Sequence, residues 1–155
     1  MIIRPATAVD AEGMAAVLNA VIAIGGTTAH EHPKTEAQVR EGYVTGADVL
    51  SCVVCEEGGE IVGWQSVGMW AGDPHIGSFV LPGLQARGAG AAMFGLTCQT
   101  LRGRGVEYII AHIRADNAPG LAYYARIGFR EIGQDPGYAL SDGRKVGRVV
   151  RRFDL

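Results

Sequence analysis

The chain has 155 residues, of which 48% are hydrophobic and 19% are charged, and its formal net charge at pH 7 is -2. This length and composition predict one compact domain with its own core and argue against a disordered chain. The slightly acidic balance excludes the basic face that non-specific nucleic-acid binding needs, and no uncharged apolar run reaches the roughly 18 residues of a membrane span. Because the N-terminus also lacks the pattern of a signal peptide, we expect a cytoplasmic protein with no membrane partner.

The first half of the chain predicts a strand, two helices and an antiparallel hairpin. A short strand at 2–6 precedes an amphipathic helix over 11–24, for which Asp10 stands in the N-cap position. A polar segment then leads to a second helix around 36–43. Two β-rich runs within 49–70 flank a Gly-Gly turn, which is typical of a hairpin.

The second half predicts a central strand, two helices, a buried strand and a closing hairpin. After a loop at 71–75 we expect a third central strand at 76–81, followed by a glycine-rich turn and a helix. The run 106–113 is apolar on nearly every residue, which suits a strand covered on both faces. A short helix then ends at Gly128, and the final hairpin turns at 142–143. This order predicts a single α/β domain over residues 1–155.

The three cysteines indicate a reducing compartment rather than a metal site. An odd number of thiols cannot pair completely, and Cys52 and Cys55 lie within one predicted strand. Alternation along that strand directs the two thiols to opposite faces, and no further ligand follows at metal-binding spacing. We therefore expect buried, apolar thiols, including Cys98 on the apolar stripe of its helix, and no bound metal.

The turn after the third central strand has the composition of a phosphate-binding loop. A strand, a glycine turn and a helix start together present free backbone amides and the positive end of the helix dipole. A nucleotide P-loop is excluded because Ala89 and Gly90 stand where Lys and Ser or Thr are required. A dinucleotide fingerprint is excluded because Met93 occupies its third glycine position.

Two ordered motifs resemble those of the GNAT family of N-acetyltransferases. Residues 85–90 (QARGAG) match the pyrophosphate turn Q/R-x-x-G-x-G/A, and residues 117–129 are similar to N-x-x-A-x-x-x-Y-x-x-x-G-F, with Gly120 in place of the alanine. More narrowly, 3–22 and 27–35 resemble the branch that acetylates phosphinothricin, methionine sulfoximine or similar amino acids. The resemblance implies the GNAT fold, a central, mixed and mostly antiparallel sheet flanked by helices.

The resemblance also implies acetyl-CoA as the cosubstrate. Backbone groups of the strand that precedes the turn would pair with the pantetheine arm, and the amides of the turn would hold the pyrophosphate. Asn117 and Tyr124 would contact the arm or the acetyl region. The implied coenzyme-binding residues are Phe79, Val80, Leu81, Gln85, Ala86, Arg87, Gly88, Ala89, Gly90, Ala91, Asn117 and Tyr124.

Acetyl transfer to an amine needs a neutral nucleophile, a stabilised oxyanion and an acid for the departing thiolate. A phenol with a pKa of about 10 can protonate a thiolate whose conjugate acid has a pKa near 8.5. By motif position Tyr124 is the expected acid, whereas Tyr123 points about 100° away on the same helix. We expect a backbone amide on the strand that ends at Leu81 to stabilise the oxyanion.

The base and the substrate contacts follow less directly from the sequence. His75 stands where related enzymes carry a glutamate, and it is interpreted either as the general base or as a loop residue. His30 and Glu31 lie in the segment that resembles the substrate-side loop, so they contact the substrate or belong to a solvated loop. A metal site at His30 and His32 is disfavoured because no third ligand is nearby in sequence.

These observations together predict direct transfer of an acetyl group from acetyl-CoA to the primary amine of a small molecule, such as an amino acid or its analogue. Two alternatives stay open. A catalytically silent acyl-CoA-binding sensor would keep the turn but lack a working base, and a protein or peptide N-acetyltransferase would need an open groove. A homodimer is expected from the resemblance, and no nucleic-acid partner is expected.

Overall fold

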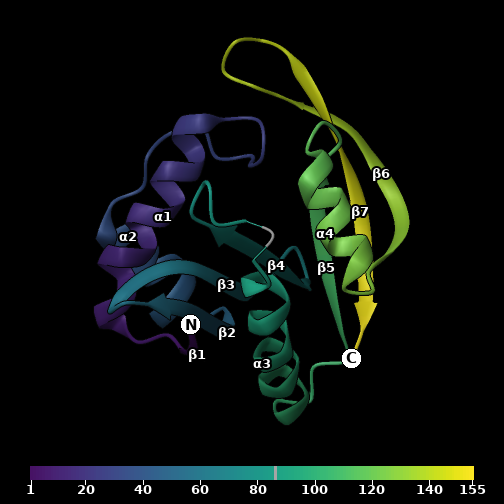
Figure 1. Ribbon diagram of the computed structural model, residues 1–155. Coiled ribbons are helices and arrows are strands. Elements are labelled where there is room, and N and C mark those ends of the chain that lie inside the picture. The colour runs from purple at the N-terminus through teal and green to yellow at the C-terminus, as the bar shows by residue number, and fades with distance from the viewer. Residues whose placement is uncertain (86) are drawn as a thin grey trace.

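Seven strands form one sheet with helices on both faces in the computed structural model, which describes residues 1–85 and 87–155 (Figure 1). The predicted contact of Ala86 lies outside the described residues. The strands are β1 (Ile2–Pro5), β2 (Val49–Glu57), β3 (Glu60–Trp70), β4 (Asp73–Val80), β5 (Tyr108–Arg114), β6 (Arg130–Ala139) and β7 (Lys145–Asp154). The helices are α1 (Ala11–Ile24), α2 (Glu36–Val39), α3 (Ala89–Gly103) and α4 (Ala118–Arg126), with a short 3-10 helix η1 (Ala8–Asp10) and a π-helix η2 (Arg40–Thr45).

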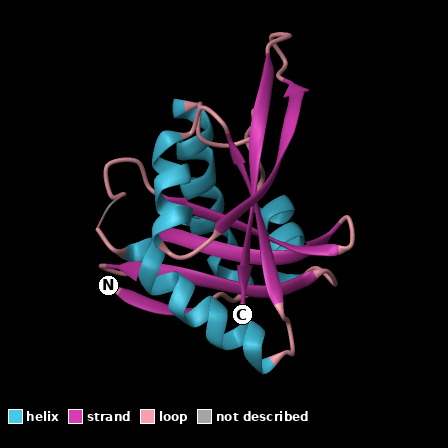
Figure 2. Cartoon of the chain, turned by 90° about the vertical axis from the view of Figure 1, so that its right-hand side faces the viewer, coloured by secondary structure: helices cyan, strands magenta, loops and turns pink. Residues whose placement is uncertain are grey.

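The sheet is mixed and mostly antiparallel, as expected from the sequence. Its strand order is β1-β2-β3-β4-β5-β7-β6, and among the described strands only β4 and β5 pair in parallel. These two strands share a single register pair, His75 with Ile110, and then diverge (Figure 1). In Figure 2 the long C-terminal hairpin accordingly stands upright while the strands of the N-terminal half lie across it. The carboxyl end of β4 therefore has a neighbouring strand on one edge only.

Two apolar layers hold the helices on opposite faces of the sheet. On one face α1 packs its Met14 and Leu18 against Trp64 of β3, whose indole Nε1 donates to the Met14 carbonyl at 3.0 Å. On the other face α3 and α4 share a core with β5, in which Phe94 and Phe129 are buried. The strand β5 is buried on both faces, which confirms the expectation from its continuous apolar run. None of the helices in the described part of the chain is long and apolar enough to cross a membrane.

Three predicted boundaries are wrong in a way that matters for the site. The strand β4 begins at Asp73 rather than at 76, because residues 73–75 continue the antiparallel register with the end of β3. The predicted loop shrinks to Ala71 and Gly72, both of which have positive φ. His75 is therefore a strand residue and not a loop residue. The last hairpin is also longer than expected, since β6 starts at Arg130, and α2 ends at Val39, where η2 continues the helical path.

Asp10 and the cysteines occupy the positions that the sequence predicts, but the tertiary structure gives Asp10 different hydrogen-bonding partners. Asp10 does stand at the N-cap of α1, but its carboxylate caps no amide of that helix and instead accepts from Arg4, at 2.8 Å for each oxygen, and from Thr7. This arrangement ties β1 to the start of α1. Cys52 and Cys55 join the cores on opposite faces, as alternation predicted, and all three cysteines are free thiols.

Candidate active site

The glycine turn ends in a helix N-terminus whose amides have no side-chain cap. Gly88 is the N-cap of α3 and has a φ of 86°, a left-handed conformation that an L side chain rarely adopts. The first backbone bond of the helix runs from the Ala92 N–H to the Gly88 carbonyl, so the preceding amides of the first turn have no intrahelical acceptor. No acidic residue occupies this turn. The geometry favours a bound anion.

The absence of a side chain at Gly90 is required for a contact with a neighbouring tyrosine as well as for the turn. A Cβ added at Gly90 would lie 2.6 Å from the Cε1 atom of Tyr123. The Tyr123 hydroxyl donates to the Gly90 carbonyl at 2.8 Å, which holds the ring of α4 against the first turn of α3. The glycine therefore allows a contact between two helices that the motif alone did not reveal.

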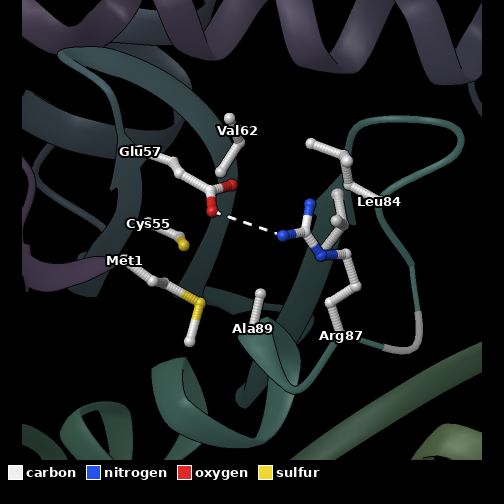
Figure 3. A pocket seen from close by; sticks show the side chains of 8 residues that line it. Met1, Cys55, Glu57, Val62, Leu84, Arg87 and Ala89 are labelled. Atoms are coloured by element: carbon white, nitrogen blue, oxygen red, sulfur yellow. Dashed lines mark hydrogen bonds and ion pairs between the residues drawn. The ribbon is translucent and has the colours of Figure 1, made fainter.

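The two polar side chains of the turn already have partners within the chain. Gln85 accepts from the Gly83 amide at 2.8 Å and donates to the Val80 carbonyl at 3.2 Å, so it braces the turn itself. Arg87 forms an ion pair with Glu57 at 3.5 Å across a cavity of about 120 Å³, where the two side chains point toward each other (Figure 3). Both groups are largely exposed, and such a pair contributes little to stability, so Arg87 is free to exchange partners.

The open edge of β4 carries peptide groups that have no strand partner. Leu81 donates its N–H to the Val62 carbonyl of β3 and accepts at its own carbonyl from Leu84. Successive residues of a strand direct their peptide groups to opposite edges, so Ser78 and Val80 direct theirs toward the side of β5. Since β5 leaves β4 after His75, these groups face away from any strand. Of the three predicted backbone contacts, only Val80 directs its peptide groups toward this edge, and its carbonyl accepts from Gln85.

The hydroxyl of Tyr124 is buried in a polar network between β4 and α4. It donates to Ser78 Oγ at 3.0 Å. The Gln65 amide nitrogen also donates to Ser78 Oγ, at 2.9 Å, and to the Tyr123 hydroxyl, at 3.2 Å. Thr97 in turn donates to Gln65 Oε1 at 2.7 Å. Burial raises the pKa of the Tyr124 phenol well above its ordinary value, so the hydroxyl is protonated at neutral pH.

Sequence reasoning missed three members of this network, Gln65, Ser78 and Thr97. Gln65 is fully buried in the middle of β3 although its neighbours along the strand are apolar or small. A polar residue in such a run is a signal that a hydrogen-bonding partner lies above the strand. The identity of that partner depended on the register that places Ser78 opposite Gln65.

His75 lies on the other face of the sheet from Tyr124. Along β4, Phe79 packs with the α1 core and Ile76 with the α3 core, and His75 shares the face of Phe79. Its ring packs edge-on against Trp70 and His112, with centroid distances of 4.9 and 4.8 Å. Burial lowers the pKa of His75, and the charges of His112 and Arg148 lower it further while Asp73 opposes them. His75 is therefore a neutral imidazole at pH 7.

His30 is part of the aromatic layer beside the carboxyl end of β4. Its Nε2 lies 3.1 Å from the Tyr43 hydroxyl, and its ring centroid is 6.4 Å from that of Phe79. Burial lowers the pKa of His30, and the charge of Lys34 adds to this effect. The described residues include no cluster of His, Cys, Asp and Glu that would hold a metal ion.

Contacts of Glu31, Thr27 and Thr28 tie the segment 25–34 to the C-terminal half of the chain. Glu31 accepts from the amide of Ser141, at 3.0 and 3.1 Å, and from its hydroxyl at 2.9 Å, which joins the segment to the tip of the β6–β7 hairpin. Asn117 donates to the Thr27 carbonyl at 3.1 Å, and Arg114 donates to the Thr28 carbonyl at 3.0 Å. The segment thus spans the space between α1 and the hairpin (Figure 1).

Asn117 has a second function as the N-cap of α4. Its Oδ1 accepts from the Gly120 amide at 3.0 Å. A Cβ at Gly120 would lie 2.3 Å from the Asn117 Nδ2 atom, so the replacement of the motif's alanine by glycine makes room for this folded side chain. Both polar atoms of Asn117 therefore have partners within the chain.

Replacing Glu31 with alanine is expected to release the hairpin tip from the 25–34 segment. Because the contact is exposed, we expect it to stabilise the closed arrangement by less than about 1 kcal/mol, or about two- to fivefold in the KM of the acceptor. Steady-state kinetics on Glu31→Ala would measure this, with Glu36→Ala as the control, since Glu36 forms an exposed ion pair with Arg40, four residues further along the chain. An equal change in both variants would contradict a function of Glu31 in closing the site.

Comparison with known proteins identifies the family. Residues 21–129 match the model of the acetyltransferase (GNAT) family, which spans more than half of the chain. With the diverging β4 and β5 and the glycine turn at the start of α3, the chain belongs to this family and is an acetyltransferase.

Relatives carry the names of several acceptors. The chain is 26% identical to the Bacillus subtilis (strain 168) protein YwnH, which has a provisional phosphinothricin acetyltransferase name, over 100% of this chain and 99% of that protein. A phosphinothricin acetyltransferase from Sinorhizobium meliloti, solved with acetyl-CoA, superposes with a TM-score of 0.83 at 19% identity, over 99% and 88% of the two chains. A ribosomal-protein-alanine N-acetyltransferase from Brucella melitensis gives the same TM-score at 22% identity over 100% of both chains, so the fold alone does not select an acceptor.

Proposed function

We propose that this enzyme transfers an acetyl group from acetyl-CoA to the primary amine of a small molecule, an amino acid or an amino-acid analogue. One observation carries the proposal. Tyr124 and His75 lie on opposite faces of the sheet, near the point where β4 and β5 diverge. An acetyl carbon held at this point would be reached by an amine from the His75 face and would lose its thiolate toward the Tyr124 face.

The open edge of β4 and the start of α3 fit the shape and charge of coenzyme A. The peptide groups of Ser78 and Val80 would pair with the amides of the pantetheine arm, in place of the strand that β5 does not supply. The pyrophosphate would sit on the uncapped amides of Ala89, Gly90 and Ala91, where Gly88 lets the backbone approach. Arg87 would exchange Glu57 for a phosphate.

Tyr124 would act as the general acid. Its pKa is raised by burial, so it remains a phenol until the leaving thiolate develops charge. Its oxygen is held by Ser78 rather than by solvent, which keeps it in one position. The oxyanion would be stabilised by a backbone amide on the free edge of β4, consistent with the peptide groups that face away from β3.

His75 would accept the proton that the substrate ammonium loses. The lowered pKa supports this function because only the neutral imidazole is a base, and a group with a pKa below its usual 6.5 is neutral at cytoplasmic pH. The packing of its ring between Trp70 and His112 fixes its orientation. Trp70, at the rim of this face, would contact the acceptor side chain.

Changing His75 to glutamine is expected to lower kcat/KM for the amine by about 10- to 100-fold at pH 7. His75→Glu keeps a base, so it should recover most of the rate and move the acid limb of the pH profile downward, since a glutamate has an ordinary pKa of about 4.3. In the wild type this limb should lie below pH 6.5, because the pKa of His75 is lowered. Profiles of kcat/KM from pH 5 to 9 measure both effects.

His32→Gln is the matched control, because His32 is an exposed histidine of the 25–34 segment. A wild-type pH profile that persists in His75→Gln would remove His75 from the mechanism and leave water as the base.

The acceptor class is supported by the closed arrangement of the 25–34 segment over the His75 face and by the names of relatives. Glu31 and His30 would shape the acceptor pocket, His30 through its contact with Tyr43 and Phe79. A segment tied to the hairpin tip leaves less room for a peptide than for an amino acid. This favours acetylation of a small molecule over acetylation of a protein.

Release of free CoA thiol from acetyl-CoA, measured across a panel of amines, tests the proposed function. The panel contains phosphinothricin, methionine sulfone and sulfoximine, the common amino acids, polyamines and a lysine peptide. Turnover confined to amino acids and their analogues would support the proposal, and turnover confined to the peptide would select the protein-modifying alternative. Binding of acetyl-CoA without turnover of any amine would select the silent sensor.

We also propose that the enzyme acts in the cytoplasm as a homodimer. The proposal rests on the family resemblance, and size-exclusion chromatography with light scattering tests the dimer directly. A monomer at micromolar concentration would contradict it.

A further inference from the structure

The hydroxyl of Ser78 is placed to carry a proton, because both of its lone pairs are occupied. A serine hydroxyl has one hydrogen to donate and two acceptor sites. Ser78 Oγ accepts from the Tyr124 hydroxyl at 3.0 Å and from the Gln65 amide at 2.9 Å. Among residues 1–85 and 87–155, the Tyr123 hydroxyl is a further hydrogen-bonding neighbour of Ser78 and can accept its hydrogen in the resting enzyme. The Ser78 hydroxyl can turn from Tyr123 to a third partner, because Tyr123 keeps its bonds to Gln65 and to the Gly90 carbonyl.

The direction of the bond from Gln65 is determined by a backbone carbonyl two steps away. The Gly90 carbonyl can only accept, so the Tyr123 hydroxyl donates its hydrogen to this carbonyl, at 2.8 Å. Tyr123 must therefore accept from Gln65, which turns the amide nitrogen of Gln65 toward Tyr123 and Ser78. The carbonyl oxygen of Gln65 faces Thr97, which donates to it. Ser78 thus cannot donate to Gln65.

Ser78 also stands at the correct place along β4. It is a half-buried residue whose peptide groups face the free edge, two residues before the end of the strand. The Tyr124 hydroxyl, in contrast, is buried and already directs its hydrogen at Ser78. A proton that leaves Tyr124 in this arrangement passes through the oxygen of Ser78.

We propose that Tyr124 and Ser78 form a two-hydroxyl relay in which Ser78 is the immediate proton donor to the departing sulfur of coenzyme A. The inference rests on the proposed function and deepens it. As the amine nitrogen forms its bond to the acetyl carbon, the C–S bond breaks and its electron pair stays on sulfur. Ser78 gives its hydrogen to that sulfur and takes the hydrogen of Tyr124. The proton that the nitrogen loses on becoming an amide passes back through Ser78 and returns Tyr124 to a phenol. Counted from the substrate ammonium, the reaction releases one proton, which is the one that His75 accepts.

Three variants test the relay. Ser78→Ala removes the donor and is expected to lower kcat by about 100-fold, the usual contribution of a general acid. Ser78→Thr keeps a hydroxyl at the same atom position and is expected to recover kcat to within about tenfold of the wild type. Ser51→Ala is the matched control, since Ser51 is a buried strand serine whose Oγ has no hydrogen-bond partner. The kcat values are measured with saturating acetyl-CoA, and calorimetry measures the Kd of acetyl-CoA for each variant.

The relay predicts that Ser78→Ala loses kcat at an unchanged Kd for acetyl-CoA, and that the double variant with Tyr124→Phe is no slower than the slower single variant. Wild-type kcat in Ser78→Ala would overturn the relay and leave Tyr124 as the direct donor. A loss that Ser78→Thr does not recover, or that Ser51→Ala shares, would assign Ser78 to packing and overturn it as well. A wild-type enzyme that turns over no amine would overturn the proposed function and the relay together.

Discussion

Replacement of Tyr124 by phenylalanine is expected to lower kcat by about 100-fold or more while the affinity for acetyl-CoA stays within about twofold. The substitution removes one oxygen, so the leaving thiolate loses its proton source. The ring would keep its packing against Tyr123 and Phe129, whose centroids lie 4.9 and 5.1 Å away. Loss of the bond to Ser78 should cost about 1 kcal/mol of stability, which leaves the protein folded.

Single-turnover and steady-state kinetics, together with calorimetric titration of acetyl-CoA, measure this prediction. Tyr108→Phe is the matched control, because Tyr108 is also bonded through its hydroxyl, to Asp73, but lies outside the network of Tyr124. An unchanged kcat in Tyr124→Phe would contradict the assignment of Tyr124 as the general acid. A parallel loss of acetyl-CoA affinity would assign it to binding instead.

Replacement of Gly90 by alanine should destabilise the protein and weaken acetyl-CoA binding at the same time. The new Cβ would lie 2.6 Å from the Tyr123 ring, so the ring must move and give up its bond to the Gly90 carbonyl. Overpacking of this kind costs about 1–3 kcal/mol, and the better helix propensity of alanine offsets about 1 kcal/mol of it. The net loss of up to about 2 kcal/mol would lower Tm by up to about 8 °C in a chain of this length.

Gly95→Ala is a matched control in the same helix, because it should raise the stability of the protein whereas Gly90→Ala should lower it. Gly95 is exposed, and no atom lies within 4 Å of a Cβ added there. Alanine at this position is expected to stabilise α3 by roughly 0.5–1 kcal/mol and to leave acetyl-CoA binding unchanged. Thermal melts and calorimetric titrations of the two variants check both signs. Equal Tm shifts in the two variants would mean that the contact with Tyr123 does not restrict which side chain position 90 tolerates.

Local patterns in the sequence were sufficient to predict most elements and the coenzyme turn. The helix 11–24 and the hairpin strands 49–57 and 60–70 agree with the structure residue for residue, because their apolar periodicity coincides with the buried faces. The glycine turn was predictable for a similar reason. Gly88 and Gly90 meet conditions set by the backbone and its nearest neighbours, and such conditions leave a fixed spacing in the chain.

The pairing of strands determined what local patterns did not. The sequence predicts a loop over 71–75, yet the register with β3 extends β4 back to Asp73 and makes His75 a strand residue. The same register brings Ser78 opposite Gln65, and the contact of Glu31 with Ser141 joins residues 110 positions apart. None of these side chains has a periodic neighbour along the chain that could indicate its partner.

The sequence by itself determined the class of fold, the family and the position of the coenzyme turn, because each rests on spacing within a few residues. The tertiary structure decided which groups meet near the point where β4 and β5 diverge. Tyr124, Ser78, Gln65 and His75 come from three elements, and their meeting depends on where β5 leaves the sheet. That divergence follows from long-range packing of both half-sheets, which no short segment of the chain encodes.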